Sequence, residues 1–175
     1  MAKFKNRSSE RLIQICYGGM IAALYVVLTL VSAAFGLSSG VIQVRISEAL
    51  CVLCVFMPSA VWGLTVGCLI ANTVTEAVPI DIFFGAVATL IGAAGAYLLP
   101  KIPRLRRIGV WLAPLPTVLA NAAILPFVLR YAYNIGDSMY FMAGTVAIGE
   151  FISAAVMGTF LRIALERTLF RRKEI

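Results

Sequence analysis

The sequence predicts an all-α integral membrane protein with six transmembrane helices and both termini cytoplasmic. The first observation is composition: 61% of the 175 residues are hydrophobic and 13% are charged, with a mean hydropathy of +0.95. A soluble domain is about half apolar, so one of this size cannot hide so much apolar surface. The second observation is that charge-poor runs cover most of the chain, and each bilayer crossing takes ~20 residues.

The third observation is the placement of the basic residues. Thirteen of the 15 Lys and Arg lie in three clusters, in the N-terminal segment, in the loop 101–107 and near the C-terminus, leaving only Arg45 and Arg130 elsewhere. The positive-inside rule places such clusters in the cytoplasm. The net charge of +7 therefore indicates topology and contact with the lipid bilayer, and we expect no nucleic acid partner.

The number of crossings between cytoplasmic clusters must be even, which requires a break inside residues 49–75. Pro58 supplies it, because proline removes a helix hydrogen bond and disfavours helical conformation at Met57. The second helix is then only ~20 Å long, and short helices in transporters often mark the binding site. We expect one membrane domain over 1–175, with helices at roughly 11–35, 45–57, 58–75, 80–100, 110–130 and 138–165.

The first helix carries a doubled pattern of small residues, Gly18 and Gly19 followed four residues later by Ala22 and Ala23. Small residues at this spacing let another helix approach closely. The neighbour could be a helix of the same bundle or of a partner protein, and the pattern fits both. No polar group on this helix is expected to lie deep enough to bind a solute.

With this topology, many polar side chains lie on the outer side of the membrane. Cys68, Asn72 and Glu76 recur every four residues, so they share one face of the third helix. The sequence therefore predicts a polar pocket open to the outside, for which the candidate residues are Gln43, Glu48, Asn72, Glu76, Asp81, Tyr131, Tyr133, Asn134 and Asp137.

Glu150 lies near the middle of the last helix, where a lone acid costs ~2.5–3.5 kcal/mol on insertion scales. We favour a ligand or proton role over an internal partner such as Asn121, because acids inside membranes are functional by default. For Glu48, an ion pair with Arg45 competes evenly with a ligand role. Glu76 and Asp81 flank a short turn, where solvation or helix N-capping by Asp81 is a serious competitor to a ligand role.

Several activities are excluded or unsupported, and we expect no enzyme. The chain has no phosphate-binding G-x-x-x-x-G-K-[ST] loop, and it contains no His that could serve as a metal ligand or a catalytic base. The pair Cys51 and Cys54 lies in an apolar helix, so we interpret these two, with Cys16 and Cys68, as small buried residues. No metal site is predicted.

Four segments carry a resemblance to known proteins: Gln43-Val44-Arg45-Ile46-Ser47-Glu48-Ala49-Leu50, Gly67-Cys68-Leu69-Ile70-Ala71-Asn72, Asp81-Ile82-Phe83-Phe84-Gly85 and Ala88-Thr89-Leu90. They resemble the QueT family of queuosine-precursor transporters, and the pattern of short spans with basic inner flanks resembles the substrate-binding S components of energy-coupling factor (ECF) transporters. Gly149-Glu150, followed by Gly158, also fits the QueT family. The most specific part of the resemblance is the block from Gln43 to Ala49.

The resemblance implies a subunit of a prokaryotic cell membrane that captures a 7-deazaguanine, such as queuine or its aminomethyl precursor, from outside. It implies docking on a shared ECF transmembrane subunit driven by two ATPase subunits, so that ATP is used by the partners and this chain holds no cofactor. In S components the inner part of the first helix meets the shared subunit. Here Gly18, Gly19, Ala22 and Ala23 match that role, with glycines where alanine is typical.

The chemistry of such a base matches the predicted pocket. A carboxylate can accept its two parallel N–H donors, and we expect Glu150 or Glu48 there, with Glu76 or Asp81 nearer an amine on the side arm. The carbonyl oxygen needs a donor, and the ring needs an aromatic face. Candidate donors are Asn72, Asn121, Gln43 and Arg45. Candidate aromatic residues are Tyr133, Phe83, Phe84 and Trp62.

Three other functions fit parts of the sequence. A proton-coupled secondary transporter would use Glu150 and Asp81 as a relay. An S component for another vitamin would share the fold and differ in the pocket. A structural membrane scaffold would explain the small-residue packing but would leave Glu150 without a role.

Overall fold

The computed structural model describes the backbone of residues 2–37, 43–75, 77–105 and 108–171, with side chains within these ranges from 8 to 168. Over these residues the chain is helical and contains no strand. In chain order the main elements are α1 (Ala2–Ala34), the 3₁₀-helix η1 (Ile46–Val55), α2 (Ser59–Val74), α3 (Pro79–Leu98), α4 (Leu115–Tyr131), α5 (Met139–Glu150), the π-helix η4 (Phe151–Met157) and α6 (Gly158–Arg171).

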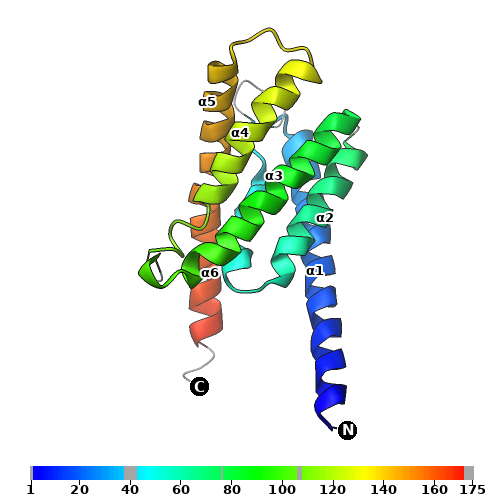
Figure 1. Cartoon of the computed structure of the whole chain (residues 1–175), viewed down its shortest axis with the longest axis vertical. Coiled ribbons are helices and arrows are strands. Elements are labelled where there is room, and N and C mark those ends of the chain that lie inside the picture. Colours follow the sequence, from blue (N-terminus) through cyan, green and yellow to red (C-terminus); the bar gives the residue numbers. More distant parts are fainter. Residues whose placement is uncertain (1, 38–42, 76, 106–107, 172–175) are drawn as a thin grey trace.

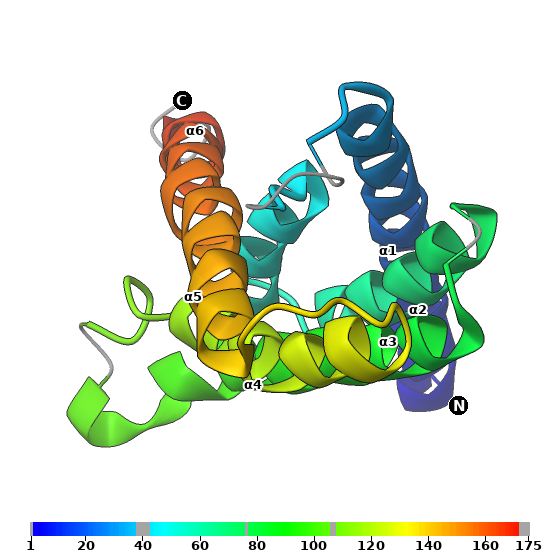
Figure 2. The same ribbon diagram turned by 90° about the horizontal axis from the view of Figure 1, so that it is seen from above.

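The helices form an elongated bundle, with both termini at one end and the α2–α3 and α4–α5 connections at the other (Figure 1). Helices that follow one another pack together, α1 on α2, α2 on α3, α3 on α4 and α4 on α5. Viewed from above, α1 stands on one side and the continuous rod of α5, η4 and α6 on the other (Figure 2). Between them lies η1, which contacts both α1 and the rod.

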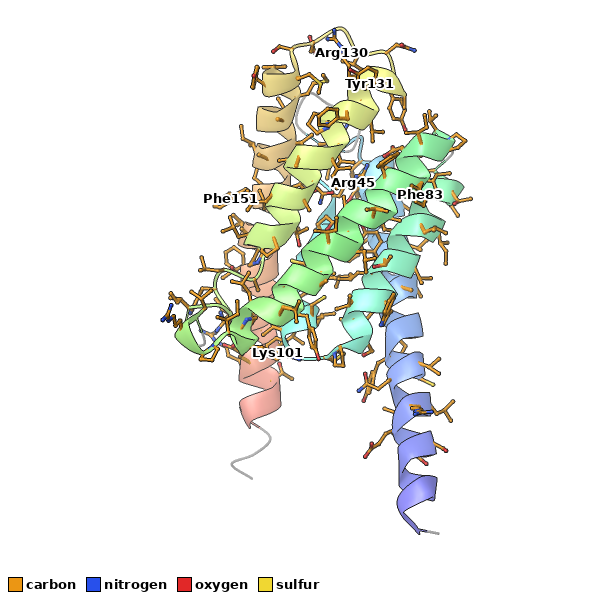
Figure 3. All side chains as sticks on the ribbon, in the orientation of Figure 1. Arg45, Phe83, Lys101, Arg130, Tyr131 and Phe151 are labelled. Atoms are coloured by element: carbon orange, nitrogen blue, oxygen red, sulfur yellow. The ribbon has the colours of Figure 1, made fainter. Side chains whose placement is uncertain are left out.

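Three described segments are long and apolar enough to cross a membrane: Ser8–Ala34, Pro79–Lys101 and Met139–Thr168. Three shorter apolar helices, η1, α2 and α4, accompany them. Large apolar side chains such as Phe83 and Phe151 point away from the bundle (Figure 3). Apolar side chains on the outside of an apolar bundle are suited to lipid, so the chain is a multi-pass membrane protein.

The helices differ from the predicted ones in several places, and the last helix runs to Arg171 instead of ending near residue 165. Helix α1 begins at Ala2, well before residue 11, and its first turns extend beyond the rest of the bundle (Figure 1). Helix α4 begins at Leu115 instead of near residue 110, because Pro114 and Pro116 suit the start of a helix and not its interior. The segment after Arg45 is a 3₁₀-helix. The chain leaves helical structure at Met57, directly before Pro58, before α2 begins.

The doubled small-residue pattern of α1 serves two different faces. A Cβ placed on Gly63 of α2 would lie 2.7 Å from the carbonyl oxygen of Gly18, and one on Gly67 would lie 3.0 Å from that of Ala22. These contacts are closer than a side chain permits, so Gly18 and Ala22 pack against α2. In contrast, a Cβ on Gly19 would meet nothing within 4 Å. Ala23 is also exposed.

The four cysteines do not share one environment. Cys51, Cys54 and Cys68 are buried in the core, as the apolar runs around them predict. Cys16 is exposed, so its predicted burial is wrong. Its side chain lies on a face of α1 that the described residues leave exposed.

Candidate functional site

A cavity of about 350 Å³ lies near the end of the bundle that is opposite to the termini. Five of the predicted site residues line it: Gln43, Arg45, Asn72, Asp81 and Tyr133. They come from the segment before η1, from the end of α2, from the start of α3 and from the α4–α5 connection. Further lining residues are Thr29, Ala33, Thr75, Ala77, Leu125, Val128, Leu129 and Ile135.

Arg45 brings the positive charge of this cavity. It is the last residue before η1, in extended conformation with φ −105° and ψ 102°, and it lies among the helices in the half of the bundle farther from the termini (Figure 3). Among the described residues its guanidinium has no hydrogen bond or ion pair, although Asp81 and Glu150 lie within electrostatic range. A guanidinium is a planar fork of N–H donors, so Arg45 offers unused donors to a ligand.

Asp81 is held at the cavity wall by contacts with two other elements. The hydroxyl of Tyr133 donates a 2.8 Å hydrogen bond to Oδ2 of Asp81, and the Asn72 amide donates to the Asp81 carbonyl oxygen at 3.5 Å. A Cβ on Gly85 would lie 2.8 Å from the Asn72 amide nitrogen, so a glycine there permits this approach. The N-cap residue of α3 is Val78 and not Asp81, and it makes no side-chain capping bond. Partial burial and the bond to Asp81 raise the pKa of Tyr133 above its ordinary value.

The α4–α5 connection presents Tyr133 to the cavity. The Arg130 guanidinium donates a 2.9 Å hydrogen bond to the carbonyl oxygen of Asp137 and so closes the connection on itself. Asn134 adopts a positive φ of 53°, a conformation that Asn tolerates better than most residues. These local contacts turn the chain so that Tyr133 and Ile135 reach the cavity.

Glu48 has a partner that the sequence did not suggest. Its Oε1 accepts a hydrogen bond from the hydroxyl of Tyr25 on α1, and both side chains are buried. One turn further along α1, the hydroxyl of Thr29 contacts that of Ser47 at 2.8 Å. The predicted ion pair with Arg45 does not form. Glu48 therefore helps to fix the start of η1 against α1 and does not line the cavity.

Glu150 and Asn121 lie next to each other in the interior. They are only 4% and 3% exposed, and the amide is near enough to influence the carboxyl group. Within the described residues, however, Oε2 of Glu150 and Nδ2 of Asn121 have no hydrogen-bond partner. Neither residue is part of the cavity lining. Glu150 is the last residue of α5, directly before the π-helix η4.

The remaining expectations have mixed outcomes. Glu76 lies outside the described residues. Phe83, Phe84 and Trp62 are exposed on the surface of the bundle, so they are not stacking partners in the cavity, whereas Tyr133 does line it. The expectation that no polar group of the first helix lies deep was wrong, because Thr29 lines the cavity.

A periodic signal could have revealed this polar face of α1. Tyr25, Thr29 and Ser32 recur at intervals of four and three residues, and the other residues of 20–34 are apolar. Residues at this spacing share one face. All three are buried, and the Ser32 hydroxyl accepts a 3.0 Å hydrogen bond from the Ile46 N–H.

A multi-pass helical membrane protein with a polar cavity toward one end of its bundle has the form of a small-molecule transport protein. The model of the QueT transporter family matches residues 15–167, so this chain belongs to the QueT family, a family of transporters and not of enzymes. This match confirms the family resemblance found in the sequence.

Among curated proteins, the chain is similar to the Queuosine precursor transporter QueT of Lactococcus lactis subsp. cremoris (strain MG1363). The two are 29% identical over 153 residues, which cover 81% of this chain and 85% of the relative. No solved structure gives a significant match.

Proposed function

We propose that this chain is the S component of an ECF-type importer and that it captures a 7-deazaguanine precursor of queuosine, or queuine itself, from outside the cell. The observation that carries the proposal is the cavity with the unpaired guanidinium of Arg45 on its wall. Its volume of about 350 Å³ lies at the lower end of the ~300–1,000 Å³ usual for ligand pockets. That size suits a bicyclic base with a short side arm.

The charges around the cavity favour a ligand that carries an amine. In this region three buried carboxyl groups, those of Glu48, Asp81 and Glu150, accompany the single guanidinium of Arg45 among the described residues. Such an excess of acid is costly in a membrane unless cations or N–H donors compensate it. Queuine and the aminomethyl precursor both bear an amine on the side arm, whereas guanine does not.

The positions of the basic residues support six spans with both termini cytoplasmic. Lys101 lies at the end of the bundle that holds the two termini, and Arg130 lies at the other end (Figure 3). Basic clusters mark the cytoplasmic side, so the cavity end faces outward in this proposal. The shorter helices η1, α2 and α4 are then the remaining crossings, with their polar ends near the cavity.

Docking on the shared transmembrane subunit would use the part of α1 that the bundle leaves free. Gly19 and Ala23 offer small residues on an open face, whereas Gly18 and Ala22 are already packed against α2. ATP hydrolysis would belong to the two ATPase partners. Gly19→Leu should prevent isolation of the complete complex while leaving ligand binding by the isolated chain intact.

The ligand is tested by purifying the protein, identifying co-purifying small molecules by mass spectrometry, and titrating queuine, the aminomethyl precursor, guanine and riboflavin. We expect the two amine-bearing deazapurines to bind most tightly. Equally tight binding of guanine would refute the substrate assignment, and preference for riboflavin would indicate an S component for another vitamin.

The mechanism is tested by uptake. The ECF proposal requires uptake only when the shared subunit, both ATPases and ATP are present. Uptake by this chain alone, abolished when the proton gradient is collapsed, would instead support a proton-coupled secondary transporter.

A further inference from the structure

The molecule contains a second polar region, enclosed behind the cavity wall. We propose that Glu150 and Asn121 form a subsite that reads the amino and carbonyl edge of the base, while the cavity end at Asp81 takes the amine of the side arm. This inference rests on the proposed function and assigns the roles that the sequence left open between Glu150 and Glu48.

The first support is two polar atoms without partners. Oε2 of Glu150 and Nδ2 of Asn121 are completely buried, and neither has a hydrogen-bond partner in the described part of the chain. Buried polar groups are normally satisfied, and in a membrane interior the cost of leaving them unsatisfied is higher still. Although the two residues are neighbours, these two atoms do not form a hydrogen bond with each other. They therefore leave one acceptor and one donor for a ligand that supplies the matching groups.

The second support separates Glu150 from Glu48. Glu48 already accepts a hydrogen bond from Tyr25, and that bond attaches η1 to α1. A ligand would have to displace this structural contact in order to use the same oxygen. Oε2 of Glu150 has no such contact among the described residues, so a ligand that uses it breaks no hydrogen bond between η1 and α1.

The third support is the position of the subsite relative to the cavity. A Cβ on Gly149 would lie 2.0 Å from the carbonyl oxygen of Gln43, so the end of α5 packs directly on the backbone of a cavity-lining residue. Asn121 is one helical turn before Leu125, which also lines the cavity. The enclosed region therefore adjoins the cavity.

The backbone at Glu150 is also unusual. The π-helix η4 begins at Phe151, directly after it, and the Ser153 hydroxyl donates a 2.9 Å hydrogen bond to the Gly149 carbonyl oxygen. π-helical turns are rare and occur frequently at functional sites, because the extra residue per turn changes the direction of the side chains around it. Here the change of helix type coincides with the buried acid.

The chemistry of the subsite defines the ligand edge that it accepts. A carboxylate accepts two parallel N–H donors, such as a ring N–H and an adjacent exocyclic amine, and an amide N–H donates to the carbonyl oxygen beside them. A 2-amino-4-oxopyrimidine ring presents this order of groups along one edge. The subsite should therefore select ligands by the exocyclic amine.

The test compares the aminomethyl 7-deazaguanine with an analogue that differs only in lacking the 2-amino group. Binding of both to the purified protein is measured by calorimetry. We expect the wild-type protein to bind the amino compound about 10- to 100-fold more tightly, because the analogue leaves a buried acceptor unpaired. Equal affinity of the wild-type protein for the two would overturn the inference without any variant.

Variants then show which residue is responsible for the preference for the amino compound. Glu150→Gln should bring the affinity ratio close to one, whereas Asp81→Asn should weaken both ligands and preserve the ratio. If Glu150→Gln weakened both ligands equally, Glu150 would have a structural role and the inference would be wrong. Should that variant fail to fold, Asn121→Ala should still lower affinity for both 4-oxo compounds, and unchanged binding would overturn the subsite. If the wild-type protein binds neither compound, the proposed function itself fails.

Discussion

The hydroxyl of Tyr133 donates a 2.8 Å hydrogen bond to the carboxylate of Asp81, which is 52 positions earlier in the chain. The same hydroxyl accepts a longer, 3.4 Å hydrogen bond from the N–H of Val78. One side chain thus connects the α4–α5 connection with the start of α3, and both ends of this link lie on the cavity wall.

Removing this link should weaken ligand binding more than stability. Tyr133→Phe deletes the donor to Asp81, and a hydrogen bond to a charged group contributes about 1.5–3 kcal/mol. We expect ligand affinity to fall about tenfold, with faster dissociation, measured by calorimetry and stopped-flow. Tyr131→Phe is the matched control, because Tyr131 is 73% exposed and does not line the cavity. Equal effects of the two variants would contradict the role of the link.

Ligand binding should require the unpaired guanidinium group of Arg45, and a positive charge alone at this position should not be sufficient. Arg45→Lys keeps the charge but loses the planar fork of donors, so we expect binding at least about tenfold weaker. Arg104→Lys should have little effect on affinity, because Arg104 is exposed and does not line the cavity. Titration of both variants gives the comparison, and full affinity in Arg45→Lys would remove the guanidinium from the site.

The contact between Tyr25 and Glu48 should matter for stability. Tyr25→Phe leaves a buried carboxyl group without its donor, which costs about 1–3 kcal/mol. We expect a lower melting temperature in detergent. The double variant with Glu48→Gln should be less destabilised than the sum of the single variants, since the two residues share one interaction. Additive losses would show that the two side chains act independently.

Two glycines should respond in opposite ways to the same substitution. Gly63→Ala places a Cβ 2.7 Å from the Gly18 carbonyl oxygen and should force α1 and α2 apart, which lowers the melting temperature. Gly19→Ala meets open space and should leave stability unchanged or slightly improved. Thermal unfolding of the two variants tests whether the two halves of the pattern face different neighbours.

Much of the fold could be predicted from single residues and their periodicity. Burial of apolar side chains, the geometric effect of Pro58 and the clustering of basic residues are local properties, so they place the helices and the break between η1 and α2. The exact start of α4 was missed because two prolines near Leu115 favour a helix start over an interior position. The 3₁₀ and π segments were also missed, since their residues are compatible with an α-helix.

The candidate site could be predicted only in part. Polarity alone identified Gln43, Arg45, Asn72, Asp81 and Tyr133, because polar groups in an apolar chain are costly and tend to collect around a polar cavity. Polarity alone could not show whether Glu48 or Glu150 has a hydrogen-bond partner within the protein. The aromatic candidates Phe83, Phe84 and Trp62 failed because an aromatic side chain is equally suited to lipid.

The sequence by itself determined the class of protein, the QueT family resemblance and five of the thirteen residues that line the cavity, since these follow from composition, polarity and matching segments. Only the tertiary structure decided that Tyr25 binds Glu48, that Gly18 packs inward while Gly19 stays open, and that polar atoms of Glu150 and Asn121 lack partners among the described residues. The physical reason is that each of these facts depends on where η1 and α2 lie between helices that are distant in the chain.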